Sequence, residues 1–159
     1  MIKVNRIQQL DDETIGHIAA GEVVERPAQV VKELLENSLD ADSTHVEVII
    51  ERGGFDSILI IDNGSGISSD DMQLSVDRHA TSKLSNFNDL NEIYTMGFRG
   101  EALASIGMVS ELTVASKTRD GDGNSITVNF GKKGDVTSHG MSYGTTVSVR
   151  DIFKNTPAR

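Results

Sequence analysis

Two short apolar runs joined through a pair of glycines constrain the fold more than any other feature of this sequence. Residues 45–51 (HVEVIIE) and 57–62 (SILIID) are rich in β-branched side chains over strand-like lengths, and Gly53 and Gly54 stand between them. This pattern predicts a β-hairpin. Helical patterns precede and follow the hairpin, so strand and helix do not alternate strictly along the chain.

The other expected elements complete an α+β arrangement. Helices are expected near 12–25, 27–40, 69–79 and 100–107, and strands near 110–117, 124–130 and 144–150. The mixed order favours a two-layer α/β sandwich, with a mixed, mainly antiparallel sheet and helices packed on one face, over a doubly wound parallel sheet. No linker or repeat divides the 159 residues, so a single domain is expected.

The helix expected at 27–40 carries an apolar stripe and a polar face. The stripe consists of Val30, Val31, Leu34, Leu35 and Leu39. Glu33, Asn37 and Asp40 share a face that we expect roughly opposite to this stripe. A carboxylate one turn from a carboxamide suits Mg²⁺ chemistry, because the amide oxygen ligates a hard cation and the carboxylate orients a water. A solvated helix face is the simpler alternative for this pattern alone.

The second strand of the hairpin delivers an aspartate to a glycine-rich loop. Asp62 ends the strand, and Gly64 and Gly66 follow in the loop DNGSGI. Glycines permit positive φ and close approach of the backbone to a ligand. The Asp62 carboxylate could accept a hydrogen bond from an exocyclic amine such as that of adenine. A tight turn is the alternative, since Asp-Asn-Gly suits one.

Two later segments carry groups suited to phosphate. Thr81, Ser82 and Lys83 are expected in a loop. Gly97, Phe98, Arg99 and Gly100 come just before an expected helix, whose N-terminal N–H groups favour an anion. The pattern is not a P-loop, because no glycine run is followed by Lys-Ser/Thr.

Composition narrows the function classes. The formal net charge is −9, which is a poor starting point for a dedicated nucleic-acid binder. The absence of cysteine excludes a disulfide framework, a thiolate metal site and a cysteine nucleophile. No apolar run approaches the roughly 20 residues of a membrane span, and no signal-peptide core is present. We therefore expect an intracellular protein, cytoplasmic or, in a eukaryote, nuclear, without a membrane partner.

Taken in order, these segments resemble the N-terminal ATPase domain of the MutL family of DNA mismatch repair proteins. The resemblance rests on IAAGEVVERPAQVVKELLENSLDA (18–41), DNGSGI (62–67), RHATSK (78–83), GFRGEALASI (97–106), GTT (144–146) and NTPAR (155–159). The family belongs to a wider group of ATPases that includes DNA gyrase, heat-shock chaperones and histidine kinases. The resemblance implies a Bergerat-type ATP-binding fold, ATP hydrolysis, and ATP and Mg²⁺ as cofactors.

The resemblance also implies roles for individual residues. Glu33 matches the general base that activates the attacking water, and Asn37 matches the Mg²⁺ ligand. Asp62 matches the aspartate that reads adenine, helped by Gly66 and Thr145. The other matched nucleotide-binding positions are Asp40 and Gly64, the lid and phosphate-side residues Thr81, Ser82 and Lys83, and the phosphate-wrapping turn of Gly97, Phe98, Arg99 and Gly100.

Partners and a larger catalytic unit are implied as well. In the family a second domain supplies a lysine to the γ-phosphate, so residues 1–159 are expected to bind ATP with weak or absent turnover. ATP binding orders an arm and a lid, here residues 1–20 and about 75–100, and joins two copies into a clamp. The implied partners are a MutS-type mismatch-recognition protein and DNA, the latter mostly through regions outside this chain.

Two other functions stay open at this point. One is the ATPase domain of a related topoisomerase or chaperone, against which GFRGEALASI and NTPAR argue. The other is a nucleotide-binding interaction module without turnover, against which the intact Glu33, Asn37 and Asp62 argue.

Overall fold

The computed structural model describes residues 24–77 and 102–155, and the structural statements below concern these residues. The elements follow the order α2 (Pro27–Asp40), β1 (Val46–Glu51), the 3₁₀ turn η1 (Arg52–Gly54), β2 (Ser57–Asp62), α3 (Ser69–Ser75), α4 (Ala102–Met108), β3 (Glu111–Lys117), β4 (Asn124–Asn129), β5 (Lys132–Lys133), β6 (Thr137–Ser138) and β7 (Gly144–Arg150). The helix expected near 12–25 lies almost entirely outside the described residues.

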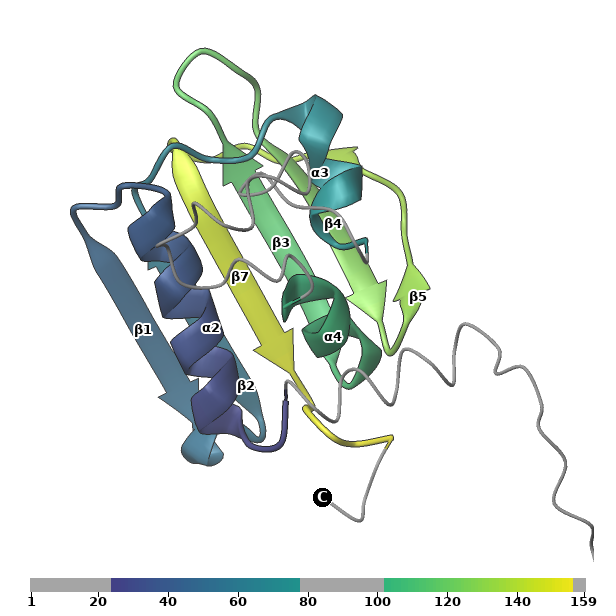
Figure 1. Ribbon diagram of the computed structural model, residues 1–159. Coiled ribbons are helices and arrows are strands. Elements are labelled where there is room, and N and C mark those ends of the chain that lie inside the picture. Colours follow the sequence, from purple (N-terminus) through teal and green to yellow (C-terminus); the bar gives the residue numbers. More distant parts are fainter. Residues whose placement is uncertain (1–23, 78–101, 156–159) are drawn as a thin grey trace, which may run out of the picture.

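The strands form one antiparallel sheet that is covered by helices on one face. The strand order is β1-β2-β7-β3-β4-β5, with β6 paired to β4, and each described pair of strands is antiparallel. Figure 1 shows α2, α3 and α4 on the same side of the sheet. The α+β prediction is confirmed. No described helix combines the length and the apolar character that crossing a bilayer requires.

Most expected elements occur close to their expected ends. The hairpin is confirmed, with β1 and β2 joined through η1. The α3 helix begins as expected after Ser68, whose side chain accepts a hydrogen bond from the Asp71 backbone N–H. It ends at Ser75 rather than at residue 79, because Val76 leaves the helical conformation. The two-residue strands β5 and β6 were not predicted, since so short a run has no periodicity.

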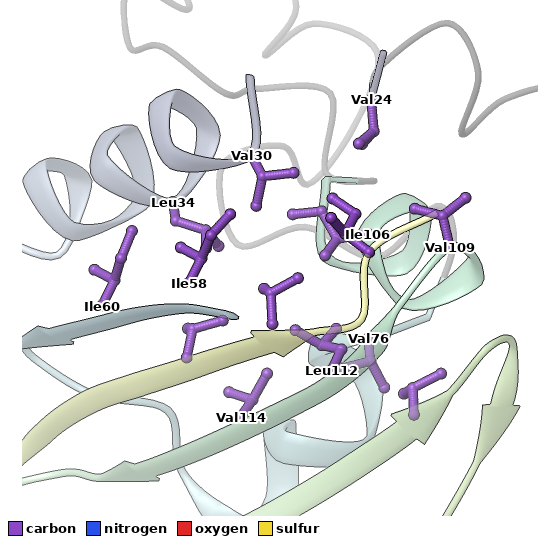
Figure 2. Packing of buried hydrophobic residues seen from close by; sticks show 14 of the residues in the cluster. Val24, Val30, Leu34, Ile58, Ile60, Val76, Ile106, Val109, Leu112 and Val114 are labelled. Carbon is purple, nitrogen blue, oxygen red and sulfur yellow. The ribbon is translucent and has the colours of Figure 1, made fainter. Parts of the chain in front are cut away.

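The hydrophobic core consists of two cross-strand rows on the helix-covered face. Residues two apart on a strand share a face, so the register between strands fixes each row. The first aliphatic row is Ile58, Val149, Leu112 and Val128, and the second is Ile60, Val147, Val114 and Ile126. All eight side chains are buried. In Figure 2, Val30 and Leu34 of α2 reach this core beside Ile58 and Ile60.

The buried stripe of α2 differs from the expected one. Leu39 is 57% exposed, whereas Ser38 is 2% exposed, and burial follows Val30, Leu34 and Ser38 at intervals of one turn. The prediction that Leu39 belongs to the buried stripe is therefore wrong. The sheet selects the side of the helix centred near Leu34, and this side includes a serine for a reason given below.

Candidate functional site

A third row on the same sheet face is polar. Asp62 pairs with Thr145, Thr145 with Ser116, and Ser116 with Asn124. These four residues are here called the polar row. They lie directly beside the second aliphatic row, at the end of the sheet where β2 and β3 end and β7 begins. The structure thus brings Asp62 and Thr145 together, as the resemblance implies, although 83 positions separate them.

The Asp62 carboxylate is held by three hydrogen bonds. Oδ2 accepts from the Ser38 hydroxyl at 2.7 Å, and Oδ1 accepts from the backbone N–H groups of Gly64 at 2.9 Å and Thr145 at 3.3 Å. A carboxylate has about four lone-pair positions. These contacts fix the orientation of the carboxylate and leave it able to accept a further hydrogen bond from a ligand.

Ser38 is a site residue that sequence reasoning missed. Its hydroxyl joins α2 to the end of β2 through Asp62, and burial of the serine follows from that contact. The available signal was its spacing, since Ser38 stands one turn after Leu34 and two turns after Val30 on the buried stripe. A polar residue at a core position requires a hydrogen-bond partner, and here the partner is the carboxylate.

The glycine-rich loop packs closely against the backbone at Ala41 and at Lys117. Gly66 has φ of +79°, and a Cβ at this position would overlap with the carbonyl oxygen of Lys117. At Gly64 a Cβ would lie 2.7 Å from the carbonyl oxygen of Ala41. The expected positive φ is confirmed for Gly66 and does not occur at Gly64. Both positions require glycine because backbone lies against them, which fixes the loop beside the polar row.

Asn63 anchors the other side of this loop. Its Oδ1 accepts from the backbone N–H groups of Thr44 and His45, each at 2.9 Å, and its Nδ2 donates to Thr44 Oγ1 at 2.8 Å. This Asn side chain therefore ties the loop to the segment that leads into β1. In place of the tight turn expected for Asp-Asn-Gly, the chain bends at Gly64 and Ser65, where the Gly64 N–H donates to Asp62 Oδ1.

Glu33, Asn37 and Asp40 are half-buried on α2. Asn37 lies about 60° around the helix from Leu34, so it borders the buried stripe. The expectation that this polar face lies roughly opposite the stripe is wrong for Asn37, because the stripe is centred on Leu34 instead of running to Leu39. Asn37 directly precedes Ser38, whose hydroxyl contacts Asp62, so this part of α2 lies toward the end of the sheet that carries Asp62.

The donor set fits a cation that is shared with a ligand. No group of three or more His, Cys, Asp or Glu among the described residues could hold a metal ion. The amide oxygen of Asn37 is one hard oxygen ligand, and Mg²⁺ commonly takes one or two protein ligands together with phosphate oxygens and waters. A cation bound to Asn37 would therefore need further ligands from a bound phosphate or from water.

Seven expected site residues lie outside the described residues. They are Thr81, Ser82, Lys83, Gly97, Phe98, Arg99 and Gly100. The residues expected to form the arm, 1–20, also lie outside, as does the expected lid from residue 78 onward. The described part of the site is thus the end that holds Asp62, Thr145 and α2.

Comparison of the sequence with known proteins gives consistent matches. Residues 25–151 match the family described as histidine kinase-, DNA gyrase B-, and HSP90-like ATPase. The chain is 53% identical over 157 residues to the DNA mismatch repair protein MutL of Halobacterium salinarum, covering 98% of this chain and 24% of that protein. It is 51% identical over 154 residues to MutL of Xanthomonas oryzae pv. oryzae, covering 96% of this chain and 25% of that protein. The chain thus spans about a quarter of the length of these relatives.

Solved structures agree with the sequence matches. The Aquifex aeolicus MutL ATPase domain complexed with ADP superposes with a TM-score of 0.63 at 36% identity, covering 86% of this chain and 46% of that one. The N-terminal domain of a DNA repair protein gives a TM-score of 0.75 at 32% identity, covering 91% of this chain and 41% of that one.

Proposed function

This chain belongs to the histidine kinase-, DNA gyrase B- and HSP90-like ATPase family as an ATPase domain of the MutL type, and from this premise we propose that it binds ATP with Mg²⁺ between α2 and the polar row. The observation that carries the proposal is the anchored Asp62 carboxylate, which keeps a lone pair for the amine of adenine. The ADP complex of the Aquifex aeolicus domain supports a nucleotide ligand.

Each end of the nucleotide has its own residues in this proposal. Asp62 accepts a hydrogen bond from the adenine amine, with Gly66 and Thr145 beside it. Gly64 and Asp40 are the remaining residues that we assign to this end of the nucleotide. On the phosphate side we assign Thr81, Ser82 and Lys83, together with the turn Gly97, Phe98, Arg99 and Gly100. The N–H groups of such a glycine-rich turn, at the start of a helix, suit a triphosphate.

Glu33 and Asn37 are assigned to the hydrolytic step. Phosphoryl transfer requires chiefly positioning, charge neutralisation and an oriented water. The Glu33 carboxylate takes the proton of the attacking water, and the Asn37 amide oxygen would hold Mg²⁺. When bound, the cation neutralises the charge that develops on the phosphate oxygens. Because the two side chains are one turn apart on α2, the helix fixes their separation.

The wider role is proposed from the named relatives. We assign this domain to a MutL-type mismatch repair protein that works inside the cell on DNA, with a MutS-type mismatch-recognition partner. ATP binding is proposed to order the arm (residues 1–20) and the lid (about 75–100) and to join two copies into a clamp. Sedimentation velocity with and without a non-hydrolysable ATP analogue tests this step, and a monomer in both conditions contradicts it.

A calorimetric titration tests the proposed ligand directly. The wild-type chain should bind a non-hydrolysable ATP analogue more tightly with Mg²⁺ than without it. Asn37→Ala should remove most of the Mg²⁺ dependence. Glu33→Ala should preserve affinity in this chain and, introduced into a full-length protein that contains this domain, should abolish ATP hydrolysis. Asp56→Asn, an exposed carboxylate at the opposite end of β2, is the matched control and should match the wild type. Failure of the folded wild-type chain to bind the analogue contradicts the proposed function.

A further inference from the structure

Ser116 is a buried hydroxyl with contacts to both sides of the nucleotide-reading end. The residue is 0% exposed and lies next to Thr145 in the polar row. Its Oγ is 2.7 Å from the backbone N of Ile67, 2.9 Å from the carbonyl oxygen of Gly144 and 2.7 Å from Thr145 Oγ1. One side chain thus joins the exit of the glycine-rich loop to the beginning of β7.

These three contacts determine which hydroxyl donates. A serine hydroxyl has one proton and two lone pairs. The Gly144 carbonyl can only accept, so it takes the Ser116 proton, and the Ile67 N–H can only donate, so it occupies one lone pair. The Ser116–Thr145 contact by itself allows either hydroxyl to donate, but with the other two bonds made, the remaining lone pair of Ser116 accepts from the Thr145 hydroxyl. The Thr145 hydroxyl therefore donates its only proton to Ser116 and can only accept a hydrogen bond from a ligand.

We propose that Ser116 is a positioning residue for base selection, because it holds the Thr145 hydroxyl in the acceptor state beside the Asp62 carboxylate. This inference rests on the proposed function and deepens it. Asp62 and Thr145 are paired across β2 and β7, and the Thr145 backbone N–H donates to Asp62 Oδ1 at 3.3 Å, so the two side chains lie side by side on one sheet face. A purine with an amine at position 6, such as adenine, supplies the donor that both groups require. A purine with a carbonyl at position 6, such as guanine, places an acceptor oxygen against the Asp62 carboxylate and the Thr145 hydroxyl, which are both acceptors.

Loss of the Ser116 hydroxyl releases Thr145. In Ser116→Ala the Thr145 hydroxyl can rotate and donate to a ligand, which reduces the disadvantage of a carbonyl at position 6. The Ile67 N–H also loses its acceptor, which weakens the loop for any nucleotide. Comparing ATP with GTP distinguishes the two effects. A weakened loop lowers the affinity for both nucleotides alike, whereas the change at Thr145 alters the ratio of the two affinities.

The test is the ratio of dissociation constants for GTP and ATP, measured by competition calorimetry on the 159-residue chain. We expect Ser116→Ala to reduce the preference for ATP about 3- to 10-fold, the range of one neutral hydrogen bond. Ser116→Thr, which keeps a hydroxyl at this position, should retain the wild-type preference for ATP. Ser110→Ala is the matched control: Ser110 is also 0% exposed, and its hydroxyl donates to the Ile106 carbonyl away from the polar row.

A second variant keeps the proposal falsifiable should Ser116→Ala fail to fold. Thr145→Val keeps the side-chain shape and removes the acceptor, so it should lower the ATP preference by a similar factor. Adding Ser116→Ala to Thr145→Val should then leave the preference unchanged. Equal losses for ATP and GTP in Ser116→Ala, or an unchanged preference in Thr145→Val, overturn the proposal. A wild-type chain that binds neither nucleotide overturns the proposed function instead, so the two failures are distinguishable.

Discussion

The polar row and the second aliphatic row lie side by side on one sheet face and are built from the same strands, yet their contacts differ. Ile60, Val147, Val114 and Ile126 are buried among other aliphatic side chains. Two residues further along each strand, Asp62, Thr145 and Ser116 form hydrogen bonds. Their partners are each other, α2 and the glycine-rich loop. A change of two residues along each strand separates the core from the site.

The difference shows how a rigid element can position the carboxylate that we propose to bind the ligand. Packing of the aliphatic rows fixes the register of β2, β7 and β3, and the same register aligns the polar side chains. Burial of aliphatic area supplies most of the free energy of folding. The polar row is expected to contribute less to stability and more to recognition, so substitutions in the two regions should separate these properties.

The largest expected effect on stability follows from Leu112→Ala in the first aliphatic row. Leu112 is 0% exposed, so its truncation leaves a cavity among packed side chains. The free energy of unfolding should fall by about 2–5 kcal/mol in urea denaturation. Where the variant is folded, its affinity for ATP should be close to that of the wild type. A loss of affinity without a loss of stability would contradict the division between the two regions.

A smaller effect on stability, with a clear effect on binding, is expected for Ser38→Ala. The substitution removes the 2.7 Å hydrogen bond to Asp62 Oδ2 and leaves the rest of α2 in place. The free energy of unfolding should fall by about 1–2 kcal/mol, because one hydrogen bond to a charged group is lost. ATP affinity should fall too, measured by calorimetry in parallel. Unchanged affinity would mean that Asp62 needs no support from α2.

Leu39→Ala should have the smallest effect. Leu39 is 57% exposed, although the helical pattern assigns it to the apolar stripe. Its truncation creates no cavity, and alanine is a good helix former, so the free energy of unfolding should change by less than about 0.5 kcal/mol. The same Leu→Ala change is thus compared at positions 112 and 39. A loss at position 39 that equals the loss at position 112 would place Leu39 in the core.

Local sequence patterns predicted the fold well because its main elements are periodic. The 27–40 helix, the 57–62 strand and the 144–150 strand occur at their expected bounds. The pattern failed where tertiary contacts decide the outcome. The wheel for α2 has aliphatic residues over a wide arc, and only the position of the sheet selects Leu34 and Ser38 over Leu39.

The site could be predicted only in part, for a related reason. Asp62 and Thr145 follow from the strand-end aspartate and from the family resemblance. Ser38 and Ser116 were missed, because serine is mostly exposed in folded proteins and the partners of both residues are distant in sequence. The alignment of Asp62, Thr145 and Ser116 arises from the register of three strands, which no single segment encodes.

The central claim is that the Asp62 carboxylate accepts the amine of adenine. The direct measurement compares the binding of ATP with that of purine riboside triphosphate, which lacks this amine, to the wild-type chain and to Asp62→Ala. Loss of the amine should weaken binding to the wild type about 10-fold or more, as expected for a hydrogen bond to a charged group, and should weaken binding to the variant much less, because only the Thr145 hydroxyl remains to accept from the amine. Equal weakening in both proteins would contradict the account.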